Sequence, residues 1–116
     1  MSKKTVMRMI VCSDIHCKEG VAAEPERAVK GIREAYVYAD STDYPHIDAI
    51  FTVGDFANRG TLEQMKIYKK CLDSSLRAET VSVLTMASHE YMHDGYESAL
   101  ARFDGVFKQS PDTHTV

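Results

Sequence analysis

The chain has 116 residues, of which 44% are hydrophobic and 27% charged, a composition typical of one soluble globular domain. With 14 Lys and Arg against 17 Asp and Glu, the formal net charge is -3, which argues against nucleic acid held by phosphate neutralisation. The apolar stretch after Lys4 is interrupted by Arg8, so it does not read as a signal peptide, and we expect a cytoplasmic protein without a membrane partner.

The first predicted strand, Val6–Cys12, leads directly into the polar cluster Ser13-Asp14-Ile15-His16. Alternate residues of an extended chain project to the same side, so Asp14 and His16 are expected to share one metal ion. Cys17 follows them, but a lone cysteine more often packs as a small hydrophobic residue. The odd count of three cysteines indicates reduced thiols in an intracellular protein.

A helix is predicted from about Pro25 to Ala39, where apolar residues recur at helical spacing. The second predicted strand, Ala49–Val53, leads into the cluster Gly54-Asp55-Phe56-Ala57-Asn58-Arg59-Gly60. Thr61 and Gln64 then have the spacing of a capping box, which predicts a second helix that ends near Leu76.

The third predicted strand, Val81–Met86, precedes the cluster Ser88-His89-Glu90, and a third helix is predicted over Tyr96–Phe107. Residues 113–116 resemble the start of another strand. The order β-α-β-α-β-α predicts an α/β fold with a parallel sheet built from right-handed crossovers. The unpaired edge of so small a sheet is an expected contact for a protein partner or a second copy.

All three clusters follow predicted strands, and parallel strands end at a common edge, so their polar side chains can converge in one crevice. Carboxylate and imidazole ligands there suit Mn, Fe or Zn. Asp55 can bridge two ions, and a two-metal site polarises phosphoryl oxygens and generates hydroxide. His89 can give a proton to a leaving oxygen, and Arg59 can contact phosphate. Asn58 and Glu90 are expected to orient these groups.

The clusters resemble the Asp-X-His, Gly-Asp-X-X-Asp/Asn and Gly-Asn-His-Asp/Glu blocks of the calcineurin-like metallophosphoesterase family. The matching residues occur in family order between about Val6 and Phe107; they are Asp14, His16, Gly54, Asp55, Asn58, Arg59, Gly60, His89 and Glu90. The resemblance implies the N-terminal half of the family's α/β sandwich, as one domain over residues 1–116 that is truncated at its C-terminus. It also implies metal-dependent hydrolysis of phosphomonoesters or phosphodiesters by a metal-activated hydroxide, with the substrate left open.

Two departures from the family's pattern bear on activity. Ser88 stands where the family has a metal-binding Asn, and its hydroxyl is a weaker ligand. The family's later His ligands, including a Gly-His-X-His block, do not occur in the sequence. The resemblance therefore implies ligands mainly for one metal, at Asp14, His16 and Asp55, and a weakened or absent activity.

Other interpretations stay open. The chain can be a non-catalytic fragment that binds a metal or a protein, and the polar clusters after the strands can be simple turns. The segment His89-Glu90-Tyr91-Met92-His93 also matches the His-Glu-X-X-His motif of zinc proteases. That motif needs a helix to present both imidazoles, whereas Asp94 and Gly95 follow here at once.

Overall fold

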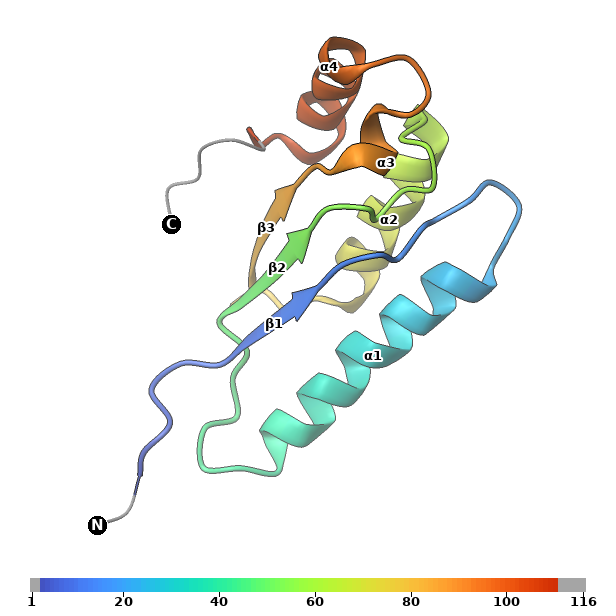
Figure 1. Ribbon diagram of the computed structural model, residues 1–116. Helices are drawn as coiled ribbons and strands as arrows, with labels where there is room; N and C mark the ends of the chain where they lie inside the picture. The colour runs from blue at the N-terminus through green and yellow to red at the C-terminus, as the bar shows by residue number, and fades with distance from the viewer. Residues whose placement is uncertain (1–2, 111–116) are drawn as a thin grey trace.

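The computed structural model describes residues 3–110 and contains a three-stranded parallel sheet with strand order β1-β2-β3 (Figure 1). The elements in chain order are β1 (Met9–Cys12), α1 (Ala23–Asp40), β2 (Ala49–Val53), α2 (Leu62–Ser75), β3 (Val81–Thr85), α3 (Ser88–Tyr91) and α4 (Tyr96–Phe107). The predicted α/β fold with a parallel sheet is confirmed. None of the described helices has both the length and the apolar character needed to cross a membrane.

The predicted elements occur, and β2 and α4 have the predicted bounds. The others have shifted ends, and the largest shift is at β1. This strand begins at Met9 rather than at Val6. The reason is a contact with Asp48, the residue just before β2. The main-chain N–H of Arg8 donates to the Asp48 carboxylate at 2.9 Å. A side chain therefore replaces the backbone partner that a longer strand would need.

Smaller shifts occur in α1, α2 and β3. α1 extends from Ala23 to Asp40 instead of Pro25 to Ala39, α2 ends at Ser75, and β3 ends at Thr85. α3 is not predicted from the sequence, so the observed order is β-α-β-α-β-α-α. The strand expected over residues 113–116 lies outside the described residues.

The start of α2 shows how a predicted cap works in practice. The Thr61 hydroxyl accepts a hydrogen bond from the Gln64 N–H at 3.3 Å, as the spacing predicts. The Gln64 side chain does not complete the capping box on Thr61, because its oxygen accepts from the N–H groups of Arg59 and Gly60 at 2.7 and 3.1 Å. Gln64 thus fixes the end of the loop after β2 onto α2.

The two faces of the sheet differ in their cover. Ile50 and Leu84 belong to the core, which also contains residues of α1, α2 and α4, and the partly buried Ile10 packs against it. On the opposite face, four apolar residues are exposed, namely Met9, Val11, Val53 and Val81, whereas Ala49 and Val83 are buried. Parallel sheets are normally covered on both faces, so this exposed sheet face is the main departure from a closed α/β domain.

An aromatic cluster anchors the loop that follows β2. Phe56 is fully buried and stacks on Tyr68 with ring centroids 5.1 Å apart, while Phe107 packs edge-on against it at 5.3 Å. The Tyr68 hydroxyl is hydrogen-bonded to that of Thr52 at 2.7 Å. Because Phe56 is held in the core, the residue before it, Asp55, is held at the sheet edge.

The two edges of the sheet also differ. Along β3, the Gln109 side chain accepts from the Leu84 N–H at 3.1 Å and donates to the Ser82 carbonyl at 2.7 Å. β1 has no strand on its outer side within residues 3–110. The prediction of an exposed edge therefore applies to β1, whereas the β3 edge is partly paired by a side chain.

Candidate functional site

The loops after β1 and β2 run side by side beyond the ends of the strands. The Asp14 N–H donates to the Gly54 carbonyl at 3.3 Å, and the His16 N–H donates to the Asp55 carbonyl at 3.0 Å. Asp14, His16 and Asp55 all have left-handed backbone, with φ of 57°, 55° and 54°. Such a conformation is uncommon outside glycine and persists where the surrounding structure imposes it, often at functional sites.

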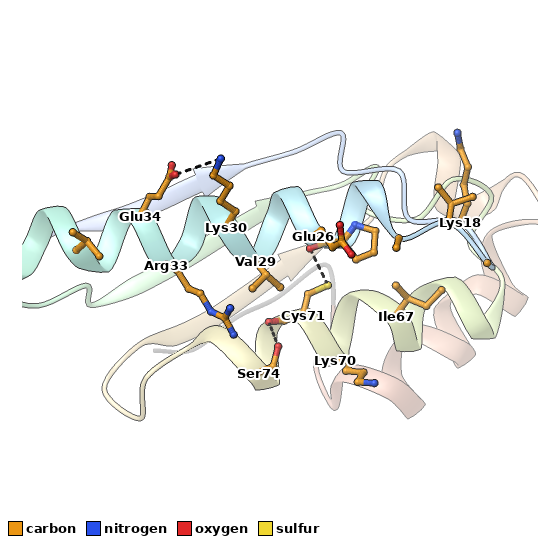
Figure 2. A pocket seen from close by; sticks show the side chains of 15 residues that line it. Lys18, Glu26, Val29, Lys30, Arg33, Glu34, Ile67, Lys70, Cys71 and Ser74 are labelled. Atoms are coloured by element: carbon orange, nitrogen blue, oxygen red, sulfur yellow. Dashed lines mark hydrogen bonds and ion pairs between the residues drawn. The ribbon is translucent and has the colours of Figure 1, made fainter.

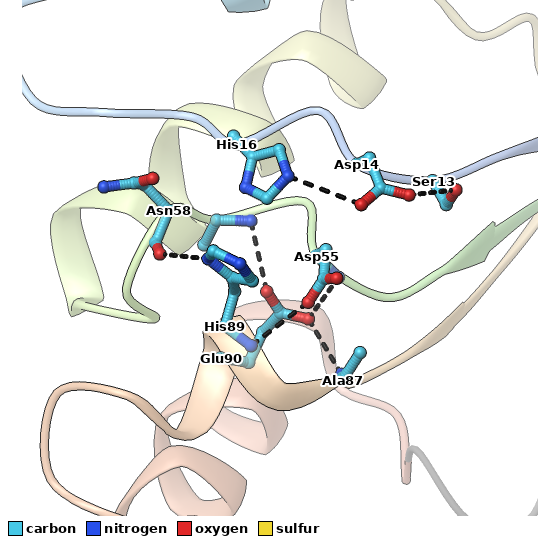
Figure 3. Close-up of polar contacts among 9 residues, drawn as sticks. Ser13, Asp14, His16, Asp55, Asn58, Ala87, His89 and Glu90 are labelled. Atoms are coloured by element: carbon cyan, nitrogen blue, oxygen red, sulfur yellow. Dashed lines mark hydrogen bonds and ion pairs between the residues drawn. The ribbon is translucent and has the colours of Figure 1, made fainter.

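This backbone corrects one prediction about Asp14 and His16. The segment is not extended, so simple alternation does not bring the two side chains together. They nevertheless meet, with His16 Nε2 3.4 Å from an Asp14 carboxylate oxygen (Figure 3). The Ser13 hydroxyl, which donates to Asp14 at 2.6 Å, and then His16 lower the pKa of the Asp14 carboxyl. The pair is therefore an ionised carboxylate beside an imidazole.

His89 enters the same cluster from α3. Its ring lies against that of His16, with centroids 4.4 Å apart and planes at 75° (Figure 3). His89 Nδ1 lies 2.7 Å from the Asn58 carbonyl oxygen. Since a carbonyl can only accept, Nδ1 carries the hydrogen, and Nε2 is the nitrogen available for proton transfer or a ligand.

Asp55 has a structural contact as well as a place in the cluster. One of its carboxylate oxygens accepts the main-chain N–H of His89 at 3.1 Å, so it caps the first turn of α3. A role as a metal ligand then rests mainly on its other oxygen. Asp14, His16, Asp55 and His89 thus come together from the loops after β1 and β2 and from α3 after β3, which is the convergence expected from the strand ends.

Glu90 lies behind this cluster rather than in it. The residue is fully buried, and its carboxylate accepts main-chain N–H groups of Asp55 at 2.6 Å, Ala87 at 2.9 Å and Ala57 at 3.3 Å (Figure 3). Burial raises the pKa of Glu90 to about 7, and these N–H donors oppose that rise. Glu90 joins the loop after β2 to α3. Glu90 lies three residues after Ala87, as the acidic residue of a capping box does, and this spacing could have predicted its bond to the Ala87 N–H.

The remaining predicted residues lie at the margin. Asn58 meets His89 through its main-chain carbonyl, not through its amide. Arg59 and Ser88 are exposed, and within residues 3–110 we find no contact from either side chain to the cluster. Their roles in phosphate and metal binding stay predictions. Cys17 is fully buried in the core, which fits packing rather than metal ligation.

The structure does not fit the zinc-protease interpretation. α3 ends at Tyr91, so His93 does not continue the helix that carries His89. The His93 N–H instead donates to the Arg59 carbonyl at 3.0 Å. Glu90, which would have to act as the protease's base, is buried among three N–H donors.

Two glycines allow the loop after β2 to approach α3 closely. Gly54 and Gly60 both have φ of 82°. A Cβ atom at Gly60 would lie 2.0 Å from the Glu90 carbonyl oxygen, and one at Gly54 would lie 2.4 Å from the Ala87 Cβ. Neither position accommodates a side chain, so the geometry of the cluster depends on both glycines.

The cluster fits a divalent ion by its chemistry, because carboxylate oxygens and imidazole nitrogens are suitable ligands. Within residues 3–110, however, no group of three or more His, Cys, Asp or Glu side chains is arranged to hold an ion. Asp14 and His16 lie within 3.4 Å of each other, and one carboxylate oxygen of Asp55 is engaged by α3. The described side chains therefore supply part of one metal site and do not assemble a dinuclear centre.

Raising the pH from 5 to 8 is expected to lower the stability of the chain through Glu90. Its pKa of about 7 in the folded state exceeds the ordinary value of 4.5, so the folded state holds a proton that the unfolded state releases. Stability is lost as the pH rises from 4.5 to about 7, and it changes little above that pH. Urea unfolding at pH 5, 6, 7 and 8 measures it. Glu90→Gln should flatten the curve, and an equal decline in that variant would contradict the assignment.

Comparison with models of known protein families gives a match over residues 7–114, to the model described as calcineurin-like phosphoesterase. The match takes in the two loops and α3, which form the cluster. None of the curated proteins compared with the chain matches it.

Proposed function

The chain belongs to the calcineurin-like phosphoesterase family, and from this premise we propose that it hydrolyses phosphate esters with a divalent metal held by Asp14, His16 and Asp55. The family match supports a phosphoesterase-like function over nearly the whole chain. The observation that carries the metal assignment is the meeting of Asp14, His16, Asp55 and His89 beyond the ends of the three strands (Figure 3).

Each residue of the cluster would have a distinct role in phosphate-ester hydrolysis. A bound Mn, Fe or Zn ion supplies Lewis-acid polarisation and a hydroxide nucleophile in sites of this kind. His89, oriented by the Asn58 carbonyl, presents Nε2 and can hold the proton that the leaving oxygen needs. Arg59 follows Asn58 in the chain and is exposed, and its planar guanidinium suits phosphate. Ser88 offers a weak hydroxyl ligand from the first position of α3.

The available donors limit the proposed activity. Asp55 can offer only its second carboxylate oxygen, because the first caps α3, and within residues 3–110 no group of three or more His, Cys, Asp or Glu side chains is arranged to hold an ion. We therefore infer binding of one ion and slow hydrolysis of phosphomonoesters or phosphodiesters, with faster turnover dependent on further ligands. Residues 1–116 form one metallophosphoesterase domain in this proposal, and its three unpaired cysteines favour the cytoplasm.

A second candidate function is binding without catalysis. The observation that favours it is the exposed sheet face, where Val11 and Val53 are 64% and 50% exposed. A partner that covered this face would bury apolar area, which is favourable at about 25 cal/mol per Å². The partner would contact the chain beside the cluster at the strand ends and beside the open edge of β1.

Replacing Asp55 by Asn separates the two candidates. Asn tolerates left-handed backbone and can still accept the His89 N–H, so the fold is preserved while a charged ligand is lost. We expect Mn²⁺-dependent hydrolysis of an aryl phosphate and an aryl phosphodiester to fall at least about a hundredfold. Asp43→Asn, in an exposed loop before β2, is the matched control and should keep full activity.

The number of metal ions bound per chain is measured by elemental analysis for the wild type and for Asp55→Asn. Equal turnover in wild type and Asp55→Asn would rule out Asp55 as a ligand. A wild-type chain that binds an ion but shows no turnover would favour the non-catalytic candidate, and one that binds no ion would remove the metal assignment.

A further inference from the structure

A groove of about 720 Å³ lies between α1 and α2 (Figure 2). It shares no residue with the cluster around His89. Its volume falls within the range of small-molecule sites in proteins. The groove is therefore large enough to hold a ligand independently of the phosphoesterase site.

The floor of the groove is apolar. Val29 on α1 faces Ile67 and Cys71 on α2 across the gap (Figure 2). Towards the two ends, Val21 and Val37 are 40% and 70% exposed. A ligand with an apolar body would bury these side chains, and that burial would favour binding.

The rim of the groove is positively charged although the whole chain carries -3. The lining includes four cations and two carboxylates, which are Lys18, Lys30, Arg33, Lys70, Glu26 and Glu34. Lys18 is paired with Glu24 at 3.8 Å, outside the lining. Lys30 is paired with Glu34 at 3.9 Å on the outer side of α1 (Figure 2). Within residues 3–110, no ion pair engages Arg33 or Lys70.

Arg33 is the cation best placed to meet a ligand. Its side chain extends from α1 toward α2 and ends beside Ser74 (Figure 2). A guanidinium binds a carboxylate through two parallel hydrogen bonds. Between residues 33 and 25, α1 rises about 12 Å, which leaves room for a medium-length alkyl chain along Val29 and Ile67.

From this charge and shape we propose that the groove binds a single-chain amphiphile with a carboxylate head, a fatty acid being the simplest member of the class. The carboxylate pairs with Arg33, and the alkyl chain lies over Val29 and Ile67 toward Val21. The proposal does not depend on the metal site, and its test does not use hydrolysis.

Calorimetric titration with decanoate, below the concentration at which it forms micelles, tests the proposal. Arg33→Gln is expected to weaken binding about tenfold, because a charge-assisted pair is lost. Arg27→Gln is the matched control, since Arg27 lies on the same helix, is 73% exposed and does not line the groove. It should bind like the wild type. Decanol should bind the wild type about as weakly as decanoate binds Arg33→Gln.

Several results would overturn the proposal. Equal affinities for decanoate and decanol would exclude a role for the head group, and equal losses in the two Arg variants would place the contact elsewhere. Absence of binding with the wild type would reject the ligand class. Sedimentation as a dimer that Arg33→Gln dissociates, without fatty-acid binding, would assign the groove to a second copy of the chain.

Discussion

Replacing Gly60 by Ala is expected to lower the free energy of unfolding by more than about 3 kcal/mol, or to prevent folding altogether. The new Cβ would lie 2.0 Å from the Glu90 carbonyl oxygen, which belongs to the main chain and not to the end of a flexible side chain. The φ of 82° adds strain for any residue with a side chain. Either the loop after β2 or α3 would have to move, so His89 would leave the cluster with it.

Gly105→Ala is the matched control for this change. Gly105 lies inside α4, and a Cβ there would meet nothing within 4 Å. Alanine is the better helix former by about 0.5–1 kcal/mol, so this variant should be slightly more stable than the wild type. Urea unfolding followed by circular dichroism compares the two. Similar midpoints for the two variants would show that the loop can move away from α3 at little cost.

Glu90→Ala is expected to cost at least about 3 kcal/mol of stability, because it leaves three main-chain N–H groups without an acceptor. Two of these groups, those of Asp55 and Ala57, belong to the loop that carries the cluster. The variant should therefore also lose the amide signals of that loop in an NMR spectrum recorded under native conditions, before global unfolding occurs.

Two other variants test whether the lost hydrogen bonds cause the loss of stability in Glu90→Ala. Glu97→Ala removes an exposed carboxylate from the first turn of α4 and should cost no more than about 1 kcal/mol. Glu90→Gln keeps one carbonyl oxygen for Asp55 and Ala87 and should fall between the wild type and Glu90→Ala. A Glu90→Ala variant as stable as Glu97→Ala would show that water satisfies the three N–H groups.

The parts of the fold that could be predicted from sequence are those with a local pattern. β2 is a short run of apolar and β-branched residues, and its predicted bounds Ala49–Val53 agree with the structure. α2 and α4 repeat apolar residues at helical spacing, and each was expected within one or two residues of its observed ends. The position of Asp14 and Asp55 after their strands follows from the same pattern.

The details of the site depend on contacts between distant segments. The left-handed backbone of Asp14 and Asp55 is stabilised by pairing between two loops about forty residues apart, which no local pattern reports. α3 has only four residues, too few for helical periodicity, and it is held by Asp55 and Glu90. The burial of Glu90 could be suspected from its capping position. The three N–H groups that donate hydrogen bonds to its carboxylate could not be predicted from the sequence.

The hydrogen bonds from the Gln109 side chain to the edge of β3 affect how copies of this sheet could associate. Sheets that stack head to tail, β3 of one molecule beside β1 of the next, form an open filament, and every such junction would have to displace Gln109 from Ser82 and Leu84. Pairing of β1 with β1 about a twofold axis uses only the open edge and closes after two molecules. One glutamine therefore biases any growth of this sheet toward a finite dimer and away from a fibre.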